Sequence, residues 1–296
     1  MSNQAETLVW LTPTLMALTL YGLGQGFVKK WISEVPPARF CLYFVAAKAL
    51  VNIGYFVTQP HPPPFTAEGL HFLWAGILAY TLDGLGWIFY FESIVAGPIT
   101  IVGTLSAAYP ALTVIFARVF LGEALQAFQY IGVALVIGGC TGLSYAPSQP
   151  GAAPVQKRWI PLAATALLLW GTAQTIVKWS YSLPQASEAN LALFNTIGGA
   201  LTLGTYGLLR GRQGRHSSSE WLKSFLPMGM MAAGDLSVIV ASRLGPISLV
   251  TPISGAYPVV TLIFAAMVLR ERVTVLQYVN VVLIVIGIFL CPGVTN

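Results

Sequence analysis

Two acidic residues lie in stretches of the sequence that are otherwise almost free of charge. Asp83 lies near the middle of an apolar block at residues 69–92, and Asp235 near the middle of another at 221–243. An unpaired charge in an apolar medium is costly, so such residues rarely persist without a partner or a task. The two carboxylates could bind a cation or carry protons. Alternatively, each is structural and is satisfied by neighbouring hydroxyl groups or by a lysine.

A second set of polar residues occurs in a motif that is present twice. The pattern Gly-x-x-Gln-x-x-Val-Lys ends at Lys29 and again at Lys178. Each lysine lies about one turn from the expected end of its helix, so it could snorkel to the interface or gate a path at its membrane face. Gln25 and Gln174 lie one turn deeper, where an amide must find a partner on another helix or on a bound solute.

The pattern Ser-x-x-Tyr-Pro also occurs twice, from Ser106 to Pro110 and from Ser254 to Pro258. A proline inside a helix removes a backbone hydrogen bond and bends the helix. Carbonyls freed within a membrane must face protein or a wet cavity, so we expect the bends, with Tyr109 and Tyr257, to line a path. Four further aromatic residues could form a wall beside it or simply pack in the core: Trp87, Trp170, Tyr80 and Tyr90.

No motif in the sequence indicates an enzyme. The patterns Gly-x-x-x-x-Gly-Lys-Ser/Thr, His-Glu-x-x-His and Gly-x-Ser-x-Gly do not occur. The three histidines and three cysteines have no metal-ligand spacing. The net charge of +5 is modest and scattered, which does not indicate nucleic-acid binding. We therefore expect no catalytic residue, no metal and no cofactor.

Composition places these residues in a membrane. Charged residues make up 8% of the chain, against about 25% in soluble domains. Hydrophobic residues reach 56%, in blocks of about 20 residues, the length that crosses a hydrocarbon core of ~30 Å. The sequence predicts an all-α polytopic membrane protein with ten transmembrane helices, at residues 8–32, 37–57, 69–92, 98–121, 126–145, 158–182, 187–208, 221–243, 246–269 and 274–292.

An internal repeat organises these helices. Residues 97–139 and 245–287 are identical at 19 of 43 positions, including Gly, Pro, Glu, Gln and Tyr, which shared hydrophobicity cannot explain. Five helices per half make the second half enter the membrane from the opposite side, so we predict two inverted five-helix repeats. We place the first repeat at 1–146, a linker at 147–157 and the second repeat at 158–296. A central cavity between them is expected to be lined by helices one, three, four, six, eight and nine.

With these motifs the sequence resembles the EamA-like family of the drug/metabolite transporter superfamily. The resemblance covers essentially the whole chain and includes the Gly-Pro turns and the Leu-x-Glu…Gln endings at 121–129 and 269–277. It implies a transporter and not an enzyme. Together with the inverted repeats, it predicts a secondary active transporter or facilitator of a small polar metabolite, with an amino-acid-like solute as the first choice.

Two other interpretations stay open. Two acids and many aromatic rings would suit export of organic cations or drugs, whereas Lys29, Lys48 and Lys178 would favour a carboxylate or phosphate. A membrane assembly or receptor subunit that transports nothing is an alternative of another class.

The remaining expectations concern partners and location. We expect a small-molecule substrate, a surrounding lipid bilayer, protons as a candidate coupling ion, no nucleic acid, and a monomer or homodimer in a bacterial inner membrane. Lysine and arginine concentrate at the loops opposite the termini, above all at residues 210–223. The positive-inside rule then places both termini outside the cell. Members of the superfamily are often drawn the other way round.

Overall fold

The computed structural model describes residues 9–31, 35–96, 108–144, 158–211, 219–270 and 273–292. Within these ranges the protein is helical and contains no strand. The helices are α2 (Leu11–Trp31), α3 (Pro37–Thr58), α4 (Leu70–Ala96), α6 (Tyr109–Phe120), α7 (Ala127–Ser144), α8 (Trp159–Ser180), α9 (Glu188–Gly199), the π-helical turn η1 (Ala200–Gly204), α10 (Thr205–Arg210), α11 (Glu220–Leu244), α12 (Ile247–Gly255), α13 (Pro258–Val268) and α14 (Val275–Leu290).

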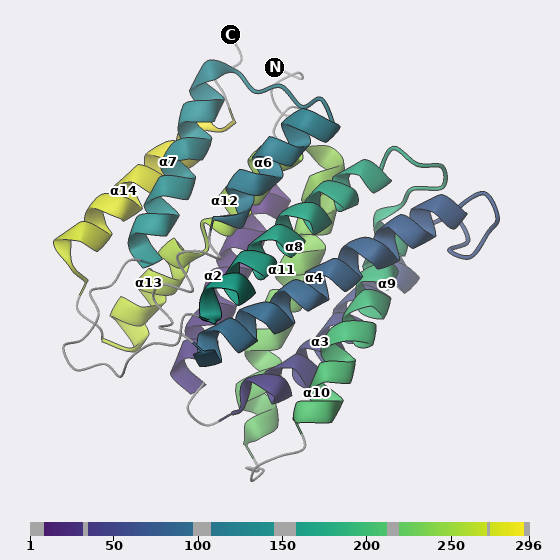
Figure 1. Cartoon of the computed structure of the whole chain (residues 1–296), viewed down its shortest axis with the longest axis horizontal. Coiled ribbons are helices and arrows are strands. Elements are labelled where there is room, and N and C mark those ends of the chain that lie inside the picture. Colours follow the sequence, from purple (N-terminus) through teal and green to yellow (C-terminus); the bar gives the residue numbers. More distant parts are fainter. Residues whose placement is uncertain are drawn as a thin grey trace.

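These elements confirm the predicted ten spans when α9, η1 and α10 count as one and α12 with α13 as another. Five spans in the described residues are long and apolar enough to cross a membrane by themselves: 38–58, 70–93, 159–180, 220–244 and 247–268. The shorter helices α6, α7 and α14 are apolar as well. The fold is therefore a bundle of ten spans, drawn in Figure 1.

Two helix starts are fixed by the same local bond in both halves. At the start of α14, Gln277 Oε1 accepts a hydrogen bond from the backbone N–H of Thr274 at 2.8 Å, and the Thr274 hydroxyl caps the helix in return. At the start of α7, Gln129 Oε1 accepts from the backbone N–H of Gln126 at 2.9 Å. This capping function explains why glutamine recurs at the two matching positions of the repeat.

The two halves are intertwined and do not form separate bundles. In the first half α4 lies along α8 and α9 of the second half, and α11 of the second half lies along α2 and α3 of the first. The helices α7 and α14 form another pair, visible at the left of Figure 1. Because the repeat relates α2 to α8, α3 to α9 and α4 to α11, each of these contacts has a counterpart.

Single residue contacts obey the same symmetry. A Cβ atom added to Gly22 would meet Val260, and one added to Gly171 would meet Leu112. In the repeat, Gly22 matches Gly171 and Leu112 matches Val260. The same contact is therefore made twice, once by each half against the other, as a pseudo-two-fold axis between inverted halves requires.

The predicted helix bend in the second half is present. The helix α12 ends at Gly255 and α13 begins at Pro258. In the first half α6 begins at Tyr109 with Pro110 in its first turn, and residues 97–107 lie outside the described part of the chain. A Cβ on Gly255 would lie 3.1 Å from Pro110 Cγ, so the bend of one half lies against the proline of the other.

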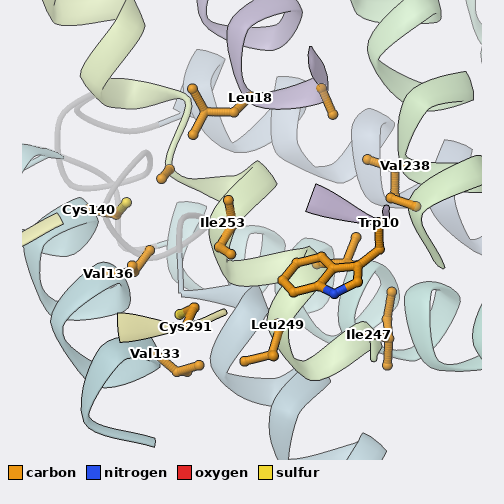
Figure 2. Packing of buried hydrophobic residues seen from close by; sticks show 14 of the residues in the cluster. Trp10, Leu18, Val133, Val136, Cys140, Val238, Ile247, Leu249, Ile253 and Cys291 are labelled. Carbon is orange, nitrogen blue, oxygen red and sulfur yellow. The ribbon is translucent and has the colours of Figure 1, made fainter. Parts of the chain in front are cut away.

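An apolar core closes the end of the bundle where α2 begins and α14 ends. Figure 2 shows Trp10 beside Leu249 and Ile247, with Cys291 and Cys140 nearby. A Cβ on Gly245, at the link between α11 and α12, would lie 2.5 Å from the Trp10 ring, so this link packs tightly against the start of α2.

Candidate functional site

A small cavity lies between the two halves, and each half contributes five side chains to its wall. The lining residues are Tyr21, Gln25, Asp83, Trp87 and Tyr109 from the first half and Trp170, Gln174, Met231, Asp235 and Tyr257 from the second. They come from helices one, three, four, six, eight and nine, which are the helices expected at the cavity. Its volume of about 50 Å³ holds only a few water molecules, so a larger solute requires side chains or helices to move.

A cluster of three charged side chains, of which Lys48 is fully buried, adjoins this cavity. Lys48 Nζ lies 2.8 Å from Asp235 Oδ2 and 3.6 Å from Asp83 Oδ2, and it donates a hydrogen bond to Asn195 Oδ1 at 2.9 Å. The lysine is 1% exposed, and its ammonium group lies 4.6 Å from the ring centroid of Phe44. All three charged residues lie near the centres of their helices, α3, α4 and α11, and therefore near the middle of the membrane.

The two acids are bound differently. Tyr21 Oη donates a hydrogen bond to Asp235 Oδ1 at 2.6 Å, and Lys48 Nζ forms an ion pair with Oδ2 at 2.8 Å, although among the described residues Oδ2 has no partner in hydrogen-bond geometry. Among the described residues the charged partner of the Asp83 carboxylate is again Lys48, at a distance longer than a hydrogen bond. Trp170 Nε1 donates to the backbone carbonyl of Asp83 at 3.2 Å and so leaves the carboxylate free of that donor.

Aromatic rings cover much of the cavity wall. Trp87 and Trp170 have ring centroids 5.1 Å apart, and Tyr109 lies 5.7 Å from Trp170. On the other side Tyr21 and Tyr257 are 6.0 Å apart in an edge-on arrangement. Trp87, Trp170, Tyr109 and Tyr257, which the sequence suggested for an aromatic wall or a path, are thus brought together here.

One residue of the cavity wall carries a buried acceptor. Among the described residues, Gln174 Oε1 has no hydrogen-bond partner although the atom is buried. A buried amide oxygen is normally satisfied, so a donor that enters the cavity would gain a bond that the protein leaves unmade. Gln25, its counterpart in the repeat, lines the same cavity. Their function in binding a solute stays a prediction.

Two predicted residues are not in the cavity wall. Tyr80 is 7% exposed and lies against α9, where a Cβ on Gly198 would lie 2.7 Å from Tyr80 Cβ. Ser254 is buried within α12, and its hydroxyl donates to the carbonyl of Thr251 at 3.2 Å. Tyr80 is placed by helix–helix packing and Ser254 by a hydrogen bond within its own helix, and their positions in the repeat reveal neither. Ser106 and the side chain of Lys29 lie outside the described residues.

Lys178 holds a helix junction at one end of the bundle. Its Nζ donates to the carbonyls of Ser242 and Gly245, at 2.8 and 2.6 Å, at the end of α11. Glu123, from the other half, accepts hydrogen bonds from two backbone N–H groups at the start of α12, each at 3.0 Å. A cation at a helix C-terminus and an anion at the next N-terminus both complement the helix dipoles. Snorkelling and gating stay predictions for Lys178, in addition to this structural function at the helix junction.

Sequence reasoning did not identify the partner of the acids. Lys48 forms an ion pair with Asp235 and Tyr21 donates a hydrogen bond to it, which supports the structural alternative for Asp235, while the function of both acids in transport stays a prediction. The signal was the position of Lys48 at the centre of an apolar span, where an ionisable residue needs a partner. Which acid it would meet could not be read from the chain.

Comparisons with known proteins agree with this architecture. A model of the EamA-like transporter family matches the sequence twice, over residues 8–145 and again over 157–291. No protein with a curated description matches it. A crystal structure of a protein is similar with a TM-score of 0.74, over 97% of this chain and 98% of the other, at 19% sequence identity. An identity that low supports the fold and carries no function.

Proposed function

The chain belongs to the EamA-like transporter family, and from this membership we propose that it moves a small polar metabolite across the membrane by alternating access between its two inverted repeats. An amino-acid-like solute is our first choice. The observation that supports the proposal is the cavity near the middle of the membrane, to which both halves contribute five residues each.

The geometry fits this mechanism in two respects. Main contacts are made between halves and occur in symmetry-related pairs, such as α4 with α8 and α2 with α11. Such symmetry supports the proposed mechanism, in which the bundle alternates between two arrangements of nearly equal energy, one open to each side. The cavity in turn offers carboxylates, amides and aromatic rings to a solute, and an amino acid presents both donors and acceptors to such groups.

Uptake into liposomes tests the proposal. Wild-type protein is reconstituted and offered labelled amino acids, amines and organic acids in turn. Trp87→Ala, which alters the cavity wall, should lower the flux of the accepted solute by about tenfold or more, equivalent to ~1.4 kcal/mol. Trp74→Ala on the same helix is the matched control, because Trp74 is 62% exposed on the outer surface and should leave flux unchanged.

The outcomes separate the candidate functions. Flux of organic cations alone would favour their export, a second candidate supported by the two acids and the aromatic wall. No flux of any offered solute would favour a non-transporting assembly or receptor subunit. Equal flux in Trp87→Ala and wild type would place the pathway elsewhere.

We further propose that a proton gradient drives the transport, with Asp83 as the coupling acid. The titratable and charged groups that face it are Lys48, Asp235, Tyr21 and Tyr109, from four different helices. We also propose that the protein lies in a bacterial inner membrane as a monomer or a homodimer.

A further inference from the structure

We propose that Asp83 is the residue that selects the solute, and that it selects an ammonium group, which takes the place of Lys48 beside it. The inference rests on the proposed transport function and deepens it, because it names the charge that the site requires. It assigns different tasks to two acids that look equivalent in the sequence: Asp235 anchors Lys48, and Asp83 binds the solute.

The first argument is the difference in partners. Asp235 accepts a hydrogen bond from Tyr21 Oη at 2.6 Å and forms an ion pair with Lys48 Nζ at 2.8 Å, so a donor or a cation lies close to each of its oxygens. Asp83 is 3.6 Å from the same ammonium, and its side chain is 14% exposed where it lines the cavity. The lysine is thus held by one acid and only approached by the other. A cation that enters the cavity competes for Asp83 without breaking the pair with Asp235.

The repeat supplies an independent argument. Tyr21 and Trp170 occupy matching positions, each directly before a Gly-x-x-Gln motif. Tyr21 donates its hydroxyl proton to the carboxylate of Asp235, but Trp170 donates its N–H to the backbone carbonyl of Asp83. Within the described part of the second half, no residue therefore supplies a counterpart of the Tyr21 bond to the carboxylate of Asp83.

The sum of the charges beside the cavity predicts that the ligand is positively charged. Among the described residues, two carboxylates and one ammonium meet beside the cavity and leave one negative charge in excess, and Lys48 itself is not among the lining residues. In a region of low dielectric constant this excess attracts a cation strongly and opposes a second anion. A solute that carries only a carboxylate is therefore excluded, whereas an amine or an amino acid brings the balancing charge.

The remaining wall suits an ammonium group. The rings of Trp87, Tyr109 and Trp170 offer negative faces to a cation. Gln174 Oε1, buried and without a partner among the described residues, offers an acceptor. An ammonium has three N–H donors, which Asp83, Gln174 and an aromatic face could share.

Three probes of similar size test the charge requirement on the unmodified protein: 2-phenylethylamine, 2-phenylethanol and 3-phenylpropionate. Binding is measured by thermal shift and calorimetry on protein purified in detergent, where a ligand of the folded state raises the melting temperature. We expect the amine to bind at least about tenfold more tightly than the alcohol, and the carboxylate not to bind. Equal binding of amine and alcohol, or tighter binding of the carboxylate, would overturn the inference without any variant.

Variants then assign the charge to Asp83. Asp83→Asn should lower amine affinity by about tenfold or more, and Asp83→Glu should restore part of it. Glu92→Gln is the matched control: Glu92 lies on the same helix but outside the cavity lining, where its Oε1 accepts from Tyr206 Oη at 3.0 Å. Unchanged amine affinity in Asp83→Asn would show that Asp83 does not bind the ammonium group.

Flux measurements in liposomes separate this inference from the proposed function. Flux of a carboxylate or a neutral solute, but not of an amine, would reject the inference and leave transport standing. No flux of any solute would reject transport itself.

Discussion

Lys48 of the first half and Asp235 of the second form an ion pair of 2.8 Å at the centre of the bundle. The pair joins α3 to α11; Asn195 of α9 accepts a hydrogen bond from Lys48, and Tyr21 of α2 donates one to Asp235. Four helices from both halves therefore meet at this ion pair. Any motion of one half against the other has to keep or replace this connection.

Removal of the Lys48 charge is expected to destabilise the fold. Lys48→Met leaves two carboxylates facing an apolar interior, and breaking a buried ion pair from one side costs about 3–5 kcal/mol. The three cysteines are free and buried, so a thiol-reactive dye reports unfolding as temperature rises. The melting temperature should fall in Lys48→Met and recover in part in the double variant with Asp235→Asn. A melting temperature equal to that of Lys30→Met, at an exposed lysine, would contradict this.

Close packing of α4 against the second half predicts a second effect. A Cβ on Gly84 would lie 1.9 Å from Thr202 Oγ1, in the π-helical turn. Gly84→Ala should therefore lower stability by about 1–3 kcal/mol through overpacking. Adding Thr202→Ala removes the obstructing hydroxyl and should recover much of the loss.

The control for this prediction is Gly138→Ala, where no atom lies within 4 Å of the new Cβ. It should be neutral or slightly stabilising, since alanine favours a helix over glycine. If Gly84→Ala melts at the same temperature as Gly138→Ala, the two helices do not pack as closely as described.

The junction of α11 and α12 provides a third prediction. Glu123 accepts from two backbone N–H groups and from the Ser248 hydroxyl, so Glu123→Ala leaves a helix start without its cap. We expect a loss of about 1–2 kcal/mol, the usual cost of a lost cap. Glu68→Ala is the matched control, an exposed glutamate that accepts a single side-chain bond from Gln185. Similar melting temperatures for the two variants would show that the cap contributes little.

The features predicted from the sequence share one property: each depends on a pattern along the chain. Apolar length fixed the spans, and the repeated Tyr-Pro and Gly-x-x-Gln patterns located Tyr109, Tyr257, Gln25 and Gln174 at the cavity. The choice between equivalent partners was not predictable in this way. Lys48 could have met either acid, and the geometry of three helices decides that it lies closer to Asp235.

Tyr80 and Lys178 also make contacts that the sequence pattern does not predict. Tyr80 lies three positions before Asp83 and so shares part of its helix face, yet the close approach of Gly198 places it in a helix contact. Lys178 was expected to snorkel or to gate, but it binds two carbonyls of a junction made by another helix pair. Such contacts arise from tertiary packing alone.

Solute binding is expected to depend on pH. A proton on Asp83 removes the excess negative charge of the cavity, so protons and an ammonium compete for one site. With equal pH on both sides of the membrane, amine binding should weaken as pH falls, in wild-type protein but much less in Asp83→Asn. Asp235→Asn should reduce stability first, because it removes the direct partner of Lys48. Identical pH profiles of wild type and Asp83→Asn would refute the competition.

Orientation in the membrane is the last prediction. The helix α2 begins and α14 ends at one end of the bundle, and the start of α3 with Arg39 and the end of α10 with Arg210 lie at the other (Figure 1). Lysine and arginine near short loops remain cytoplasmic during insertion, so the end with the termini should face the outside.

Ser182, an exposed residue just after α8, lies at that outer end. In whole cells an impermeant maleimide should label Ser182→Cys strongly, against a low background because the native cysteines are buried. The partner variant is Ser218→Cys, in the basic loop outside the described residues, and it should react only after the membrane is permeabilised. The reverse pattern, with Ser218→Cys labelled in intact cells and Ser182→Cys protected, would show the opposite orientation, with both termini in the cytoplasm.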